Sequence, residues 1–242
     1  MANPTKLAQT QMLAPRIALI HATPLAMAPI QGAFARLWPE AQCANLLDDS
    51  LSADLSAAGE LGEALTTRFV QLAQYSERTG ARAILFTCSA FGAAIEAAAA
   101  SVAVPTHKPN YAMFREAIST TPAAGVLRIG LLSTFEPSIA SMSDELLQLA
   151  CANEVTIELK TAFVPDAMSL LAQGDGAAHD RLIASRSTDL QACDVVMLGQ
   201  FSMARAQQMV QAAVGKPVLT SPDSAVRLLK SLCAAVPADS LS

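Results

Sequence analysis

Residues 83–92 read Ala-Ile-Leu-Phe-Thr-Cys-Ser-Ala-Phe-Gly, and this stretch decides the fold that the whole chain predicts. An apolar run over 83–86 ends abruptly in three polar residues with Cys88 in the middle, and an alanine-rich segment follows Gly92. This order predicts a buried parallel strand, a tight turn and a helix N-terminus. Open α/β sheets bind ligands at the carboxyl ends of their strands, so Cys88 is the leading candidate for a reactive atom. We expect the positive end of the helix dipole to favour its thiolate.

The rest of the chain repeats this alternation of apolar strands and helical segments. Besides 83–86, apolar runs predict strands at residues 16–20, 41–47, 102–106, 127–132, 155–159, 194–199 and 216–220. Strands that alternate with helices form parallel sheets covered on both faces, so the predicted fold class is α/β.

Two parts of the chain follow the same plan. Residues 83–95 (AILFTCSAFGAAI) and 195–207 (VVMLGQFSMARAQ) both run from an apolar strand through a polar turn into a helix. Their separation of about 110 residues indicates a duplicated lobe and not a solenoid repeat. We expect a first lobe made of 16–109 plus 216–242, a second lobe at 110–215, and a flexible N-terminal tail at 1–15.

Composition excludes several classes of function. The chain has 242 residues, 52% hydrophobic composition and a formal net charge of −5, with no long basic run, so nucleic acid is not an expected partner. No uninterrupted apolar run reaches the length of a membrane span, and the N-terminus lacks the apolar core of a signal peptide. Five widely spaced cysteines without a C-x-x-C pair predict reduced thiols and a cytoplasmic location.

Cofactor signals are absent from the sequence as well. There is no G-x-G-x-x-G or P-loop motif, so no nucleotide cofactor is expected. The three histidines, His21, His107 and His179, have no zinc-type spacing, so no metal is expected. His179 and Asp180 are expected on a surface helix.

Three motifs together resemble the aspartate/glutamate racemase superfamily, which includes glutamate, aspartate and hydantoin racemases, maleate isomerase and arylmalonate decarboxylase. The motifs are LFTCSAFG at 85–92, RIGLLSTFEPS at 128–138 and VVMLGQFSMA at 195–204, and the resemblance extends from residue 16 to about residue 232. It implies two similar Rossmann-like lobes related by a pseudo-twofold axis, with the active site between them. It further implies a small carboxylate substrate, no cofactor, and a possible homodimer.

The resemblance also assigns catalytic residues. Cys88 matches the cysteine of the first lobe, while the cysteine of the second lobe falls at Gln200. Glutamine cannot take or give a proton at neutral pH, so ordinary two-thiol racemisation is in question. Glu136 or His21 could supply the second acid or base. Alternatively, Glu136 stabilises a helix start and His21 has a structural role.

The resemblance also implies which residues bind the substrate. The predicted binding residues are Thr23, Ser89, Ala90, Thr134, Gln200, Phe201 and Ser202. Ser202 is also a plausible N-cap for the helix after Gly199, and capping is compatible with binding a carboxylate.

The reaction predicted from these residues is thiol-mediated proton transfer at the carbon next to a carboxylate, in an amino acid, a hydantoin or a related small acid. We therefore expect a cofactor-independent racemase or isomerase. The alternatives are a one-thiol arylmalonate-type decarboxylase and a non-catalytic protein that binds small carboxylates. A cysteine hydrolase is less well supported, because it would need His21 or His107 as a base within reach of Cys88.

Overall fold

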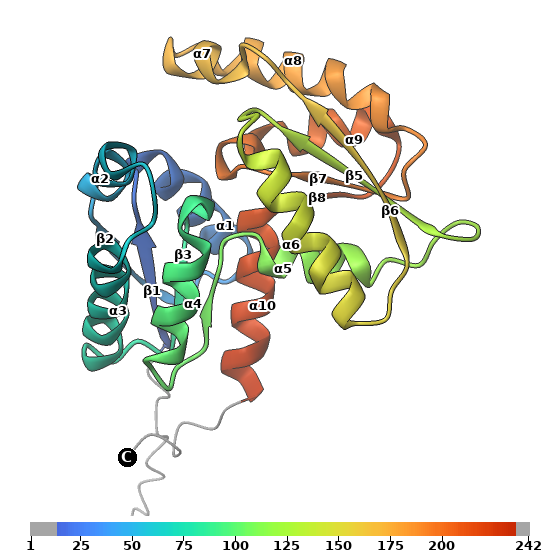
Figure 1. The fold of residues 1–242 in the computed structure, drawn as a ribbon. Coiled ribbons are helices and arrows are strands. Elements are labelled where there is room, and N and C mark those ends of the chain that lie inside the picture. The colour runs from blue at the N-terminus through green and yellow to red at the C-terminus, as the bar shows by residue number, and fades with distance from the viewer. Residues whose placement is uncertain (1–13, 236–242) are drawn as a thin grey trace, which may run out of the picture.

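The computed structural model describes residues 14–235, so residues 1–13 of the predicted tail lie outside the described residues. The chain forms two lobes, each built on a parallel four-stranded sheet (Figure 1). The strands of the first sheet are β1 (Arg16–His21), β2 (Gln42–Leu47), β3 (Ala83–Phe86) and β4 (Thr106–His107). Those of the second sheet are β5 (Leu127–Ser133), β6 (Ile157–Phe163), β7 (Val195–Leu198) and β8 (Val218–Thr220).

The two sheets have the same topology. The strand order is β2-β1-β3-β4 in the first sheet and β6-β5-β7-β8 in the second, and every pair of neighbours is parallel. In the first sheet, Ile17 of β1 lies between Cys43 of β2 and Ala83 of β3. The predicted α/β architecture with two similar lobes is confirmed.

Helices connect the strands and cover the sheets. The α-helices are α1 (Met27–Leu37), α2 (Ser50–Ala58), α3 (Glu63–Arg78), α4 (Gly92–Ala100), α5 (Tyr111–Ile118), α6 (Ser138–Ala152), α7 (Ala167–Ala172), α8 (Gly176–Ser187), α9 (Gln207–Val214) and α10 (Ser221–Ala235). Short 3-10 helices are η1 (Pro24–Ala26), η2 (Ser89–Phe91), η3 (Thr188–Leu190) and η4 (Phe201–Ala206).

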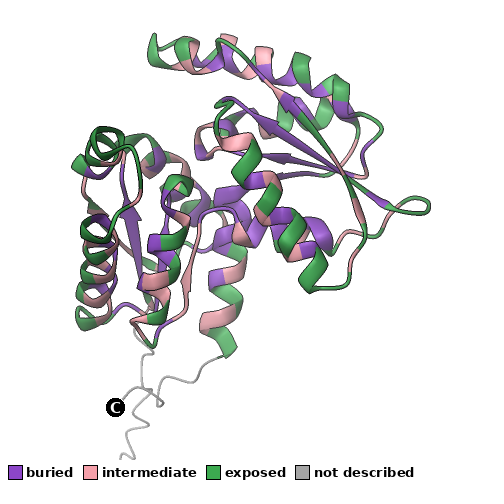
Figure 2. Ribbon diagram, in the orientation of Figure 1, coloured by how far each residue is buried: buried purple, intermediate pink, exposed green. Residues whose placement is uncertain are grey.

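Buried apolar side chains lie on both faces of each sheet, which explains why the central strands are apolar without alternation. Figure 2 shows these central strands as buried. On one face of the first sheet, Phe69 of α3 packs against Phe86 of β3 and Phe91 of η2, with ring centroids 5.2 and 4.7 Å away. Helices α1 and α10 cover the other face. The second sheet lies between α8 with α9 and α5 with α6.

The last strand lies in a different sheet from the one predicted. The expected boundary at residue 216 assigned it to the first lobe, but Val218–Thr220 pair with β7 in the second sheet. Helix α10 begins at the next residue and packs on the first sheet together with α1. The chain therefore crosses between the lobes after β8, because an apolar run of three residues carries no information about which sheet edge it joins.

Two local elements also differ from the sequence expectation. The structure forms helix α2 at 50–58, where no helix was expected. Strand β4 covers Thr106–His107 instead of 102–106. Pro105 has no backbone N–H to donate to a neighbouring strand, although its carbonyl accepts a hydrogen bond from the Ile84 N–H at 2.8 Å. Within residues 14–235, no helix combines the length and apolar character needed to cross a membrane.

Candidate active site

A cleft of about 170 Å³ lies where the carboxyl ends of β3 and β7 face each other. Both lobes, the β1–α1 connection and the segment between the lobes contribute side chains to it. The residues that line it are Thr23, Leu25, Ala26, Thr87, Cys88, Ser89, Pro109, Asn110, Met168, Gly199, Gln200, Phe201 and Ser202. Among these described residues, Cys88 has the one readily ionisable side chain, which makes it the candidate acid or base of the cleft.

Cys88 follows β3 after Thr87 and has an extended backbone that leads into η2. Its thiol is half-buried. Burial raises the pKa of Cys88 above its ordinary value, and the Ala90 N–H, which hydrogen-bonds the sulfur, lowers it to a smaller extent. The expectation of a thiolate favoured by the helix dipole is therefore wrong in direction, because desolvation outweighs a single backbone donor. A raised pKa favours the protonated thiol, which is the form that can donate a proton.

Gln200, which occupies the position expected for a second cysteine, is held by four hydrogen bonds. Its Oε1 accepts from the Thr134 N–H at 2.8 Å and from the Thr134 hydroxyl at 3.1 Å. Its Nε2 donates to Ser133 Oγ at 2.8 Å and to Ser138 Oγ at 3.1 Å. Both lone pairs and both protons of the amide are thereby used. The side chain connects the end of β7 to the β5–α6 connection and offers no proton to a ligand.

Asn110, just before α5, is a cleft residue that the sequence analysis did not select. It is only 2% exposed, and its Oδ1 accepts a 2.7 Å hydrogen bond from the Ser221 hydroxyl at the start of α10. Its Nδ2 has no hydrogen-bond partner among the described residues. A buried amide donor without a partner costs free energy unless a ligand accepts from it. Its position between the two predicted lobes was the one signal in the sequence that could have identified it.

A protein-family model matches most of the sequence. The family model for Asp/Glu/Hydantoin racemase matches residues 21–229. The chain belongs to this family. A comparison with curated proteins finds no relative.

Solved structures of the racemase family share the fold. Allantoin racemase from Klebsiella pneumoniae superposes with a TM-score of 0.70 at 15% identity, covering 92% of this chain and 89% of that chain. An aspartate racemase homologue from Pyrococcus horikoshii OT3 superposes with a TM-score of 0.65 at 16% identity, covering 90% of this chain and 99% of that chain. Unliganded arylmalonate decarboxylase superposes with a TM-score of 0.61 at 17% identity, covering 93% of this chain and 95% of that chain. At these identities the likeness shows the fold alone.

The two residues expected to supply a second acid or base lie outside the racemase-family cleft. Glu136 is exposed in the β5–α6 connection and is not among the residues that line the cleft. It does not cap α6 through a side-chain hydrogen bond, since that helix has Pro137 as its N-cap. His21 is fully buried at the end of β1 and does not line the cleft either.

Both ring nitrogens of His21 have partners. Nδ1 lies 2.8 Å from the Thr87 hydroxyl, and Nε2 lies 3.0 Å from Asn45 Oδ1. Nε2 therefore donates to the carboxamide oxygen of Asn45, which can only accept. Nδ1 contacts the Thr87 hydroxyl, which also lies 3.3 Å from the Ile20 carbonyl oxygen and donates to it. Burial lowers the pKa of His21, and the hydrogen bond to Asn45 opposes this shift. His21 holds Thr87 beside Cys88, and among the described residues no hydrogen bond joins its ring to the thiol.

The predicted binding residues divide into two groups. Thr23, Ser89, Gln200, Phe201 and Ser202 line the cleft, whereas Ala90 and Thr134 do not. The Ala90 backbone N–H hydrogen-bonds the Cys88 sulfur. The Thr134 backbone N–H hydrogen-bonds Gln200, which lines the cleft.

Several of these residues have a second structural role. Thr23 Oγ1 caps η1 by accepting from the Leu25 N–H, and Phe201 is buried in the apolar cluster of the first sheet. The predicted N-cap role of Ser202 is wrong, because it lies inside η4, whose N-cap is Gln200. Its hydroxyl has only a weak 4.0 Å contact with Met168 Sδ in the cleft.

The buried neutral His21 should make stability fall in mild acid. The unfolded chain binds a proton to this histidine below about pH 6.5, whereas the folded chain keeps it neutral until its lowered pKa is reached. The contribution of neutral His21 to the free energy of unfolding is thus fully present above about pH 6.5. It is lost as pH falls, at up to about 1.4 kcal/mol per pH unit.

Melting temperatures measured from pH 8 to pH 5 check this prediction. His21→Gln, which keeps hydrogen-bonding groups but cannot titrate, should have a shallower pH dependence than the wild type. Parallel curves for the two proteins would show that His21 does not contribute.

Proposed function

We propose that this racemase-family chain is a cofactor-independent enzyme that protonates the carbon next to a carboxylate, with Cys88 as the single acid. The reaction that suits this site best is decarboxylation of a malonate-type acid followed by protonation of the resulting enolate. The observation that carries the proposal is the four-fold hydrogen bonding of Gln200, which leaves the side of the cleft opposite Cys88 without a proton carrier.

The protonation state of Cys88 supports the same reaction. In the proposed step, one carboxylate of the substrate leaves as carbon dioxide and the bonding electron pair moves into an enolate. Cys88 Sγ–H then transfers its proton to the carbon, and the thiolate regains a proton from water. A thiol whose pKa is raised by burial is in the correct form for this role at neutral pH.

Hydrogen-bond donors around Cys88 would stabilise the enolate. Asn110 Nδ2 is a buried donor without a partner in the described range 14–235, and Ser89 and Ser202 line the same cleft. Donors that are held in place before the reaction lower the energy of the developing negative charge more than mobile water does. No cofactor enters the proposal.

Racemisation or isomerisation is the second candidate, and the match to the racemase family over residues 21–229 favours it. It would require a proton carrier on the face of the substrate opposite Cys88. The two reactions differ in their products, so they can be separated directly.

Deuterium incorporation tests the proposal. The enzyme, with EDTA present, is incubated in D2O with α-methyl-α-phenylmalonate, and separately with single enantiomers of glutamate, aspartate, allantoin and a 5-substituted hydantoin. We expect the malonate to release carbon dioxide and give one enantiomer of the monoacid with one deuterium. Exchange with inversion of an amino acid or hydantoin, and no malonate turnover, would instead establish the racemase. No turnover of any compound would favour a protein that only binds carboxylates.

A further inference from the structure

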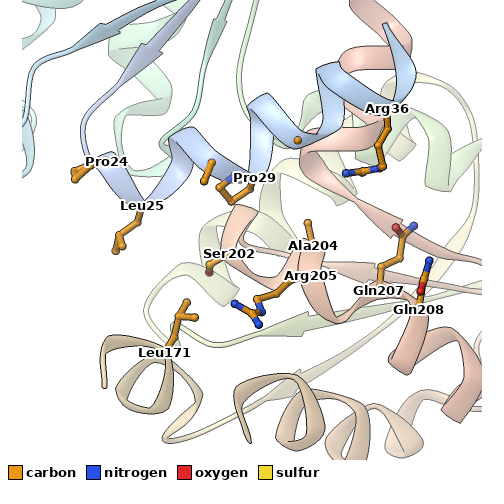
Figure 3. Close-up of a pocket in the computed structure, with 12 residues that line it drawn as sticks. Pro24, Leu25, Pro29, Arg36, Leu171, Ser202, Ala204, Arg205, Gln207 and Gln208 are labelled. Carbon is orange, nitrogen blue, oxygen red and sulfur yellow. The ribbon is translucent and has the colours of Figure 1, made fainter. Parts of the chain in front are cut away.

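A second, larger pocket adjoins the cleft that contains Cys88. It has a volume of about 760 Å³ and shares Leu25 and Ser202 with the smaller cleft. Figure 3 shows it between α1, which carries residues of the first lobe, and η4 with α9, which carry residues of the second. A volume of this size accommodates a ligand much larger than the few atoms around the reacting carbon.

The lining of this pocket combines apolar and cationic groups. Pro24, Leu25, Ala28, Pro29 and Leu171 provide an apolar surface, and Leu25 is 60% exposed despite its size. Two arginines, one from each lobe, provide the charge: Arg36 and Arg205. No acidic residue is among the described residues that line the pocket. The pocket therefore suits an apolar chain that carries an anionic group.

The guanidinium of Arg205 is held in place by contacts with α8. Its Nε donates to both carboxylate oxygens of Asp180, at 2.9 and 3.0 Å. The same carboxylate lies 2.8 Å from Nδ1 of His179, which is fully buried in α8 and not on its surface as the sequence suggested. A Cβ at Gly176 would clash with the Arg205 guanidinium, so glycine at this position allows the group to lie against the helix.

This arrangement leaves the other edge of the guanidinium for a ligand. The two terminal nitrogens of Arg205 donate no hydrogen bond to any residue in the described range 14–235. Figure 3 shows them directed toward Ser202 and Leu171, and Ser202 also lines the smaller cleft. Arg36, on the opposite wall, donates instead to Asp223 at 2.6 Å. A planar guanidinium fixed at Nε is prepared for two parallel hydrogen bonds to an oxyanion.

We infer that the larger pocket binds a second anionic group of the substrate, a carboxylate carried on an apolar arm, and that Arg205 is the residue that recognises it. The position of the reacting end at Cys88 rests on the proposed function, while the anion site at Arg205 stands on its own geometry. The substrate is then an elongated acid with two anionic ends, and Leu25 and Leu171 contact the arm between them.

Binding without turnover tests this inference. Isothermal titration calorimetry with the full-length protein compares the dicarboxylates glutarate, adipate, pimelate and suberate with monocarboxylates of equal length, from pentanoate to octanoate. We expect at least one dicarboxylate to bind about tenfold to a hundredfold more tightly than its monocarboxylate partner, as for hydrogen bonds to charged groups. Arg205→Gln should abolish this preference. Arg181→Gln, which removes an exposed charge from α8, should retain it.

Equal affinities of both acid series in the wild type, or an unchanged preference in Arg205→Gln, would overturn the inference. Should Arg205→Gln fold poorly, Ala28→Trp provides the second test, because Ala28 is exposed on α1 and a large side chain there fills the pocket without touching Asp180. If Ala28→Trp still prefers dicarboxylates to monocarboxylates, the inference is also overturned. These titrations involve no reaction, so a failure of the proposed decarboxylation and a failure of the anion site give different results.

Discussion

Replacing Cys88 with serine is expected to lower kcat by about 10³-fold while KM changes little. A hydroxyl is a far weaker acid than a thiol, so the proton that the enolate needs is no longer available at neutral pH, and general acids contribute about 10² to 10⁴-fold to such reactions. The measurement is steady-state turnover of the malonate identified in the D2O experiment. Cys151→Ser, at an exposed cysteine of α6, is the matched control and should keep full activity.

The pH dependence of the wild type follows from the same assignment. Cys88 must be protonated to act as the acid, so activity is present below its pKa and lost as pH rises through it. Burial raises this pKa above its ordinary value, so kcat should be constant near neutrality and decline only above about pH 8.5. An increase of kcat between pH 7 and 9 would contradict the acid role and indicate a thiolate base. Full activity of Cys88→Ser would exclude Cys88 from the chemistry altogether.

Asn110→Ala is expected to lower kcat by about 10² to 10³-fold, as removal of one preorganised donor to an oxyanion does in other enzymes. The lost donor is the buried Nδ2, which has no partner among the described residues and belongs to a residue that lines the cleft. The measurement is kcat together with the melting temperature, so that loss of fold is distinguished from loss of catalysis. Asn153→Ala, on an exposed asparagine after α6, is the control.

Two related variants make the test of Asn110 specific. Asn110→Asp keeps the shape of the side chain but replaces the donor with a negative charge, so its activity should be no higher than that of Asn110→Ala. Ser221→Ala removes the hydroxyl that donates to Asn110 Oδ1, and we expect a smaller loss because it only orients the amide. A normally folded Asn110→Ala with unchanged kcat would show that Nδ2 does not act on the intermediate.

The candidate site was predictable from the sequence only in part. Cys88 lies just beyond the apolar run 83–86, and a strand end is a local feature, so its place after β3 could be read directly. Glu136 also follows a strand, but its side chain lies at the surface outside the cleft. The side on which a loop residue points depends on the packing of its neighbours, which no local pattern reports.

The sequence by itself determined the α/β fold with two similar parallel sheets, because strand and helix patterns depend on neighbouring residues. Tertiary structure alone decided that β8 joins the second sheet, that Gln200 is bound by Thr134 and Ser133, and that Asn110 is oriented by Ser221. These hydrogen bonds join residues 66, 67 and 111 positions apart. Gln200 meets Thr134 and Ser133 only when β5 and β7 pair in the second sheet, and Asn110 meets Ser221 only when α10 packs beside α5. The same residue types in the sequence therefore do not reveal which of them will interact.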